Sequence, residues 1–157
     1  MSFLQDVNKW LVKVDYRYNQ AFQNICYDFS TTVAERSPVS SGHLLGSFSP
    51  SEGTLSTHYY PGGESAWKTG PGGWFKDEAI ASANREQAMA DLEPRIKATT
   101  ESLEGGNTFF LSNDVEYFQM AEFEGWEKTG PYRMVNTTVE DLEVIIPEAV
   151  KRAKQVI

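Results

Sequence analysis

The stretch SPVSSGHLLGSFSP, from Ser37 to Pro50, decides how the chain folds, because a long helical pattern runs into it and stops. Pro38 disfavours the helical region at the residue before it, so the preceding helix is expected to end near Ser37. Residues 40–42, Ser-Ser-Gly, are typical of a turn. The segment HLLGSFS, residues 43–49, then predicts a short strand. The stretch is therefore expected to form a corner between a helix and a sheet.

The helix before this corner is marked by apolar residues that recur every three or four positions. This is the period of an α-helix and predicts one helix over residues 2–35, roughly 50 Å long at about 1.5 Å per residue. Trp10 and Tyr16 lie off the stripe. The helix is therefore either a core helix with incidental aromatic residues or one that also packs on a neighbouring subunit. The stripe consists of Leu4, Val7, Leu11, Val14, Tyr18, Phe22, Ile25, Phe29 and Val33.

The segment after the corner combines glycine, proline and aromatic residues. Residues 57–75, THYYPGGESAWKTGPGGWF, are too rich in glycine and proline for a regular helix and too aromatic for simple disorder. We therefore expect an extended loop or arm, over about 51–76, that orders by packing. A helical pattern returns over residues 77–103, and Pro94 within it predicts either a kink or the start of a new helix.

The C-terminal third predicts a strand at NTFFLSND, a turn or two of helix at VEYFQMAEFEG, and a final helix over residues 134–157 that bends at Pro147. Taken together, the elements predict an α+β fold and a single domain, 1–157. A long N-terminal helix and a C-terminal helix are expected to pack on a small, mainly antiparallel sheet that carries the extended Gly/Trp-rich loop.

Composition limits the functions that the chain can have. The formal net charge is -8 and the pI is about 4.8, which argues against a nucleic-acid grip built from clustered Lys and Arg. The aromatic content of 13% is typical of chains with interaction surfaces. Cys26 is the only cysteine, so no internal disulfide forms, and synthesis in a reducing cytoplasm is expected. We find neither a signal-peptide pattern nor an apolar run of membrane-spanning length.

Motifs for catalysis or cofactor binding are weak. GGESAWKTG lacks the glycine that a phosphate-binding loop needs directly before Lys-Thr, since Trp67 stands there. No nucleophile-elbow pattern surrounds a serine that could join His43 or His58 in a triad, and the two histidines lack metal-ligand spacing. The sequence predicts no cofactor and no metal.

A cluster of carboxylates over residues 114–127 leaves one enzymatic alternative open. Glu122 and Glu124 could act as the paired carboxylates of a small cytoplasmic hydrolase. The other interpretation is an acidic edge, beside Gly125, that faces Lys or Arg of an adjacent subunit.

A short repeat joins two distant parts of the chain. AWKTGPGGW, residues 66–74, and GWEKTGPY, residues 125–132, both carry Trp followed by Lys-Thr-Gly-Pro, which indicates the same turn type. Each offers an aromatic residue on a rigid turn. We therefore predict that intermolecular contacts are made by Trp67, Trp74, Trp126 and Tyr132, together with Glu122 and Glu124.

Two motifs and the order of the elements resemble the tail-completion, or head–tail joining, proteins of long-tailed bacteriophages. Such proteins carry Pro-x-x-[Ser/Thr]-Gly-x-Leu-x-x-Ser after an N-terminal helix, and residues 38–47, PVSSGHLLGS, match it with His43 in place of a basic residue. A Val-x-Tyr signature followed by Glu-x-Gly is matched by residues 115–125, VEYFQMAEFEG, with the spacing shifted by one. The resemblance covers roughly residues 34–154.

The resemblance implies a virion structural protein of the neck or tail end, and not an enzyme. Such proteins form rings, commonly sixfold, that complete or terminate the tail and join it to the head connector. The implied partners are other copies of this chain and the tail terminator, tail tube or head-connector proteins, with DNA passing through the lumen. Pro38, Gly42, Leu44 and Ser47 would form the architectural corner of the subunit.

Overall fold

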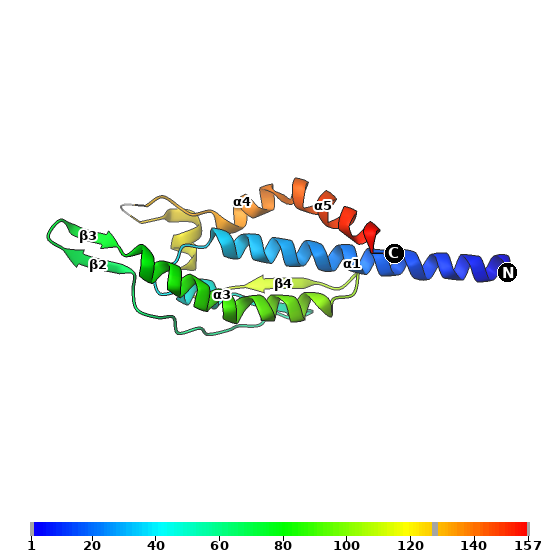
Figure 1. Cartoon of the computed structure of the whole chain (residues 1–157), viewed down its shortest axis with the longest axis horizontal. Coiled ribbons are helices and arrows are strands. Elements are labelled where there is room, and N and C mark those ends of the chain that lie inside the picture. Colours follow the sequence, from blue (N-terminus) through cyan, green and yellow to red (C-terminus); the bar gives the residue numbers. More distant parts are fainter. Residues whose placement is uncertain (1, 127–128, 157) are drawn as a thin grey trace.

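The computed structural model describes residues 2–126 and 129–156. It confirms an α+β fold, 59% helical and 12% strand. Helices lie along most of the length of an elongated molecule, as Figure 1 shows. The helical elements are α1 (Phe3–Arg36), α2 (His43–Gly46), α3 (Glu78–Glu101), the π-helical turn η1 (Met120–Glu124), α4 (Met134–Glu140) and α5 (Leu142–Gln155). The strands are β1 (Ser49–Glu52), β2 (Trp67–Gly70), β3 (Gly73–Lys76) and β4 (Phe109–Ser112).

Helix α1 confirms the predicted long N-terminal helix. It begins after Ser2, where a capping box with Gln5 satisfies free backbone groups of the first turn. It ends at Arg36, and the next residue, Ser37, has the extended backbone that a following proline favours. The C-terminal half of α1 packs against α3 on one side and against α4 and α5 on the other. The N-terminal half runs on beyond the rest of the molecule (Figure 1).

The core lies where α1 ends and α3 crosses the corner. Phe48, Leu45, Leu92 and Ile96 are among the largest fully buried side chains, and they join the end of α1 to α2 and α3. The buried apolar cluster consists of Val33, Ala34, Val39, Leu44, Leu45, Phe48, Ala88, Leu92, Ile96, Val115, Ala121 and Met134.

The strand predicted over residues 43–49 is wrong. His43–Gly46 form the single helical turn α2, and the strand β1 begins only at Ser49. Two backbone carbonyls at the end of this turn accept hydrogen bonds from Arg95 of α3. Arg95 donates to Gly46 O at 2.7 Å and to Phe48 O at 2.6 Å. A short apolar run does not distinguish a helical turn from a strand, and here a distant arginine decides between them.

The strands form two separate two-stranded antiparallel sheets in place of the single small sheet expected. β1 pairs with β4, which confirms the strand predicted at NTFFLSND, while β2 pairs with β3 as a hairpin. The hairpin corrects the expectation of a loop over all of 51–76, since within this range only residues 53–66 and the two turn residues 71–72 lack helix and strand. Its turn, Gly70-Pro71-Gly72-Gly73, places proline and glycine at the centre of a tight turn.

Both proline-containing helices are continuous. α3 runs through the exposed Pro94 as one helix, so of the two alternatives the start of a new helix there is wrong. Asp77 caps its N-terminus by accepting hydrogen bonds from the backbone N–H groups of Ala79 and Ile80. The predicted final helix is divided at Asp141 into α4 and α5, and α5 continues through Pro147.

Candidate interaction site

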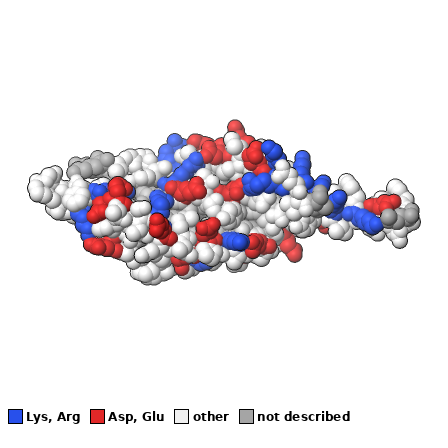
Figure 2. Space-filling view, in the orientation of Figure 1, with Lys and Arg blue, Asp and Glu red and all other residues white. Residues whose placement is uncertain are grey.

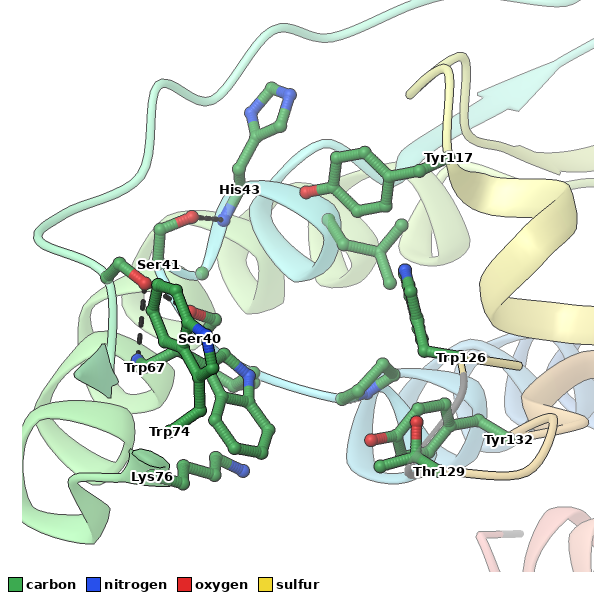
Figure 3. Close-up of a pocket in the computed structure, with 15 residues that line it drawn as sticks. Ser40, Ser41, His43, Trp67, Trp74, Lys76, Tyr117, Trp126, Thr129 and Tyr132 are labelled. Atoms are coloured by element: carbon green, nitrogen blue, oxygen red, sulfur yellow. Dashed lines mark hydrogen bonds between the residues drawn. The ribbon is translucent and has the colours of Figure 1, made fainter. Parts of the chain in front are cut away.

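A pocket of about 720 Å³ opens at the end of the molecule opposite the N-terminus of α1. It lies between the β2–β3 hairpin, the corner that leads into α2, and the residues Trp126, Thr129 and Tyr132. Figure 3 shows Trp67 and Trp74 on one side and Trp126 and Tyr132 across from them. The structure thus brings together all four aromatic residues that the sequence predicts as contacts, although they are spread over 66 positions, from 67 to 132. We call this space the aromatic pocket.

The hairpin wall of the aromatic pocket follows from strand register. Trp67 lies opposite Lys76, and Thr69 lies opposite Trp74. Residues directly opposite one another in an antiparallel pair share a face, as do alternate residues of one strand. Trp67, Trp74 and Lys76 therefore project from the same face of the hairpin, and all three line the pocket. Phe75 projects from the other face.

The opposite wall depends on the backbone pairing of Trp126 with Thr129, after η1. Trp126 and Thr129 exchange two backbone hydrogen bonds, of 2.8 and 2.9 Å. The ring of Trp126 lies 6.5 Å from that of Tyr117 and 6.3 Å from that of Tyr132. Gly125, at φ 71°, allows the close approach, because a Cβ there would lie 2.5 Å from Thr129 O. The two copies of the Trp-containing repeat thus supply facing walls of one pocket.

The floor of the pocket is the corner between α1 and α2. Pro38, Gly42 and Leu44 line it. Gly42 is left-handed, at φ 83°, and an added Cβ would lie 3.0 Å from Asn84 O on α3. The buried Asn84 side chain holds the corner in place by donating to Ser40 O at 2.6 Å and to Glu64 O at 2.7 Å. The corner is therefore tied both to α3 and to the loop that precedes the hairpin.

Ser47, the last residue of the predicted corner, is buried and does not line the pocket. Its hydroxyl accepts a hydrogen bond from Tyr60 N at 3.2 Å and lies 3.5 Å from His43 Nδ1. His43 Nδ1 in turn lies within hydrogen-bonding distance of Tyr60 O. The other histidine, His58, pairs with Asp91 at 3.1 Å. This serine and these histidines therefore anchor the loop over residues 58–60 to α2 and α3.

Glu122 is not exposed, so its predicted place in an acidic contact edge is wrong. Its side chain is fully buried, and its two carboxylate oxygens accept hydrogen bonds from Asn136 N at 2.9 Å and Val135 N at 3.1 Å. These N–H groups belong to the first turn of α4, where a carboxylate satisfies free donors and complements the helix dipole. Glu124 is exposed. The two carboxylates proposed for a hydrolase therefore lie in different environments, and only one reaches solvent.

The pocket contains aromatic and hydroxyl groups but few charges. Among the described residues that line it, Lys76 is the one side chain that carries a fixed charge, and none is Asp or Glu. Burial raises the pKa of Tyr117 above its ordinary value, against the opposing effect of a hydrogen bond to the Leu44 backbone. Within residues 2–126 and 129–156, no group of three or more His, Cys, Asp or Glu is placed to hold a metal ion. The arrangement suits the burial of apolar and aromatic groups.

A second apolar surface lies at the opposite end of the molecule, on the projecting part of α1. The body of the protein meets α1 at Asn19, whose Oδ1 accepts a hydrogen bond from Gly105 N at 2.6 Å. Before that point, apolar side chains on one face of the helix remain in solvent, with Phe3 80% and Trp10 62% exposed. We call this face the N-terminal stripe; it consists of Phe3, Leu4, Val7, Trp10, Leu11 and Val14. Trp10, which the sequence places off the apolar stripe, borders this face because it lies three residues after Val7 and four before Val14 on the helix.

The sequence alone did not divide the helix at this point, because the apolar period continues unbroken from Leu4 to Val33. It also missed Lys76, Tyr117 and Thr129 as pocket residues. The alternation Trp67-x-Thr69 and Trp74-x-Lys76 around TGPGG is a hairpin signal that places Lys76 beside the tryptophans. Tyr117 stands in the VEYF motif, but nothing in the sequence pairs it with Trp126.

Comparison of the chain with protein-family models, curated proteins and solved structures gave no match. Over the described parts of the chain, no helix combines the length and the apolar character needed to cross a bilayer.

Proposed function

We propose that this protein is a structural component of a bacteriophage virion, located in the neck or at the tail end. In this role it completes or terminates the tail and joins it to the head connector as one subunit of a ring. The proposal rests on the resemblance carried by residues 38–47 and 115–125. Both motifs contribute to the aromatic pocket. The first supplies residues of its floor, and the second contains η1, which comes directly before the wall residue Trp126.

The observation that carries the proposal is the exposure of the pocket aromatics. Trp67 is 39%, Trp74 63% and Trp126 42% exposed, although burying aromatic side chains is strongly favourable. A folded chain that leaves three tryptophans around one pocket has a contact surface that a partner would complete. A subunit whose work is binding needs such a surface, and the loops that carry it can adjust on docking.

The charge of the molecule fits a ring through which DNA passes. Acidic and basic side chains are interspersed over the face shown in Figure 2, without a large basic patch. With a net charge of -8, the subunit repels the phosphate backbone. A lumen lined by such subunits would let DNA move without adhering to the wall.

Electron microscopy tests the proposal. Particles made without this protein should accumulate as filled heads and separate tails, and adding purified protein should join them. The purified protein alone, or with tail proteins, should form rings. A matched pair of variants links the result to the pocket: Trp126→Ala should block joining, whereas Phe123→Ala, an exposed aromatic outside the pocket, should not. Complete, infectious particles in the absence of the protein would overturn the proposal.

A further inference from the structure

We propose that copies of this chain bind head to tail, with the N-terminal stripe of one copy inserted into the aromatic pocket of the next. This inference deepens the proposed function and rests on it for the expectation that the assembly is a closed ring. The partner that binds in the pocket is thus a second copy of the same polypeptide.

The positions of the two surfaces favour this contact. The aromatic pocket and the N-terminal stripe lie at opposite ends of the long axis (Figure 1). Two different complementary patches on one molecule give a heterologous contact, which repeats from copy to copy and closes into a ring when the rotation permits. A contact between two identical stripes would instead produce a twofold dimer and would leave both pockets empty.

The size of the surfaces is sufficient. The stripe presents six apolar side chains, and at about 100 Å² for each, roughly half the area of a large aromatic residue, they amount to on the order of 600 Å². With a similar area from the pocket, the contact buries about 1,200 Å² in total, which is at the lower end of the range for specific, stable interfaces. Each subunit of a ring makes the contact twice, so closure strengthens a contact that is weak by itself.

Shape and charge are also complementary. The pocket volume of about 720 Å³ admits a few large side chains, such as Phe3 and Trp10 at the free end of α1. Lys76 brings a positive charge to the pocket, and Asp6 lies in the first turn of α1, one helical turn from Phe3 and Trp10. An ion pair between Asp6 of one copy and Lys76 of the next would set the orientation of the inserted helix.

Mixing two defective variants tests the contact. Leu4→Asp damages the stripe and Trp74→Asp damages the pocket, so each protein alone should lose self-association by on the order of tenfold or more. A mixture should form one-to-one pairs and nothing larger, because one intact stripe can still enter one intact pocket. Matched controls alter the opposite faces and leave the stripe and the pocket intact: Val12→Asp on α1 and Phe75→Asp on the hairpin should assemble as the wild type does. Sedimentation analysis measures each size.

A second experiment, in which the charges of Asp6 and Lys76 are reversed, tests the same contact even if Leu4→Asp or Trp74→Asp folds poorly. Lys76→Glu should weaken assembly, and mixing it with Asp6→Lys should restore the full assembly. In the mixture the two reversed charges attract each other, and the unaltered Asp6 of one variant pairs with the unaltered Lys76 of the other. The inference is overturned if Trp74→Asp alone still dimerises as well as the wild type, since the stripes would then bind one another. It is also overturned if the variants do not pair when mixed, or if the wild type remains monomeric at about 100 μM, where a contact of micromolar Kd would be nearly saturated.

The two proposals fail separately. If the mixed variants pair, but heads and tails join normally in particles that lack the protein, the proposed contact is supported and the proposed phage role is contradicted. If heads and tails stay unjoined without the protein, but the mixed variants do not pair, the phage role is supported and this contact is contradicted.

Discussion

Gly42 illustrates how one residue can fix a corner through both backbone and packing. It occupies the left-handed region at φ 83°, and its missing side chain leaves room for Asn84 O and the Ala88 side chain. Gly53 is also left-handed, at φ 77°, but nothing lies within 4 Å of its would-be Cβ. Comparing substitutions at these two glycines therefore separates the effect of backbone conformation on stability from the effect of packing.

Gly42→Ala is expected to lower the free energy of unfolding by about 2–4 kcal/mol, from about 1–2 kcal/mol of left-handed strain plus the displacement of α3. Gly53→Ala should cost only the strain, about 1–2 kcal/mol. Urea denaturation followed by circular dichroism measures both. Equal losses in the two variants would show that the contact with Asn84 and Ala88 contributes nothing.

Glu122 is expected to matter for folding through its charge. Glu122→Gln retains the shape, but it replaces one acceptor oxygen by an NH₂ group that faces a backbone N–H of α4. Charge-assisted hydrogen bonds contribute about 1.5–3 kcal/mol, and the unfolding free energy should fall by about that amount. Glu124→Gln, at an exposed position, should change it by less than about 0.5 kcal/mol. If the two substitutions had the same effect in urea titrations, the capping role of Glu122 would be refuted.

Cys26 should make stability depend on pH in the alkaline range. Burial raises the pKa of its thiol from 9.0 to about 12, so between these values the folded chain keeps a proton that the unfolded chain has lost. Stability is then complete below pH 9 and falls by about 1.4 kcal/mol per unit as the pH rises toward 12. Cys26→Ala should flatten this slope between about pH 9 and 10. Chemical denaturation at each pH would show it, and an unchanged slope would count against a buried, protonated thiol.

At the scale of elements, the long helix could be predicted because its period is local information. The helical turn α2 could not, because it depends on Arg95, 47 positions beyond Phe48 along the chain. The β2–β3 hairpin does have a local signal in TGPGG, but glycine content alone favoured a loop. Composition and the repeat pointed to the four aromatic residues that line the pocket, and their role in intermolecular contacts stays a prediction. The burial of Glu122 could not be predicted, because it depends on a helix that begins 12 residues later, at Met134.

The two halves of α1 should differ in dynamics. Residues 3–16 make a helix of about 21 Å in which every residue but Val7 is exposed, and isolated helices of this length are marginal in water. In the monomeric Leu4→Asp variant, their amides should exchange with solvent much faster than those of residues 19–36. Assembly of the wild type should slow exchange in residues 3–16 selectively. Hydrogen exchange with mass spectrometry measures both, and uniform protection along α1 in the monomer would contradict this prediction.

At the scale of the whole molecule, two electrostatic effects compete during assembly. Each copy carries a net charge of -8, so approaching copies repel one another over a distance of about 10 Å at 0.1 M salt. The proposed pair of Asp6 and Lys76 attracts, but an exposed ion pair contributes only about 0–1 kcal/mol. The apolar contact itself is not weakened by screening, so repulsion is the larger salt-dependent contribution.

Assembly should therefore strengthen as salt is added. Between about 50 and 500 mM NaCl, where the screening length falls from roughly 14 to 4 Å, the Kd of the one-to-one pair formed by Leu4→Asp and Trp74→Asp should decrease. The pair is the right object for the measurement, because it isolates one contact from ring closure. A repeat with Asp6→Asn in the background of Trp74→Asp, the copy whose stripe is inserted, removes the ion pair and should steepen the dependence. A Kd that rises with salt would mean that charge pairs, and not the apolar stripe, hold neighbouring copies together.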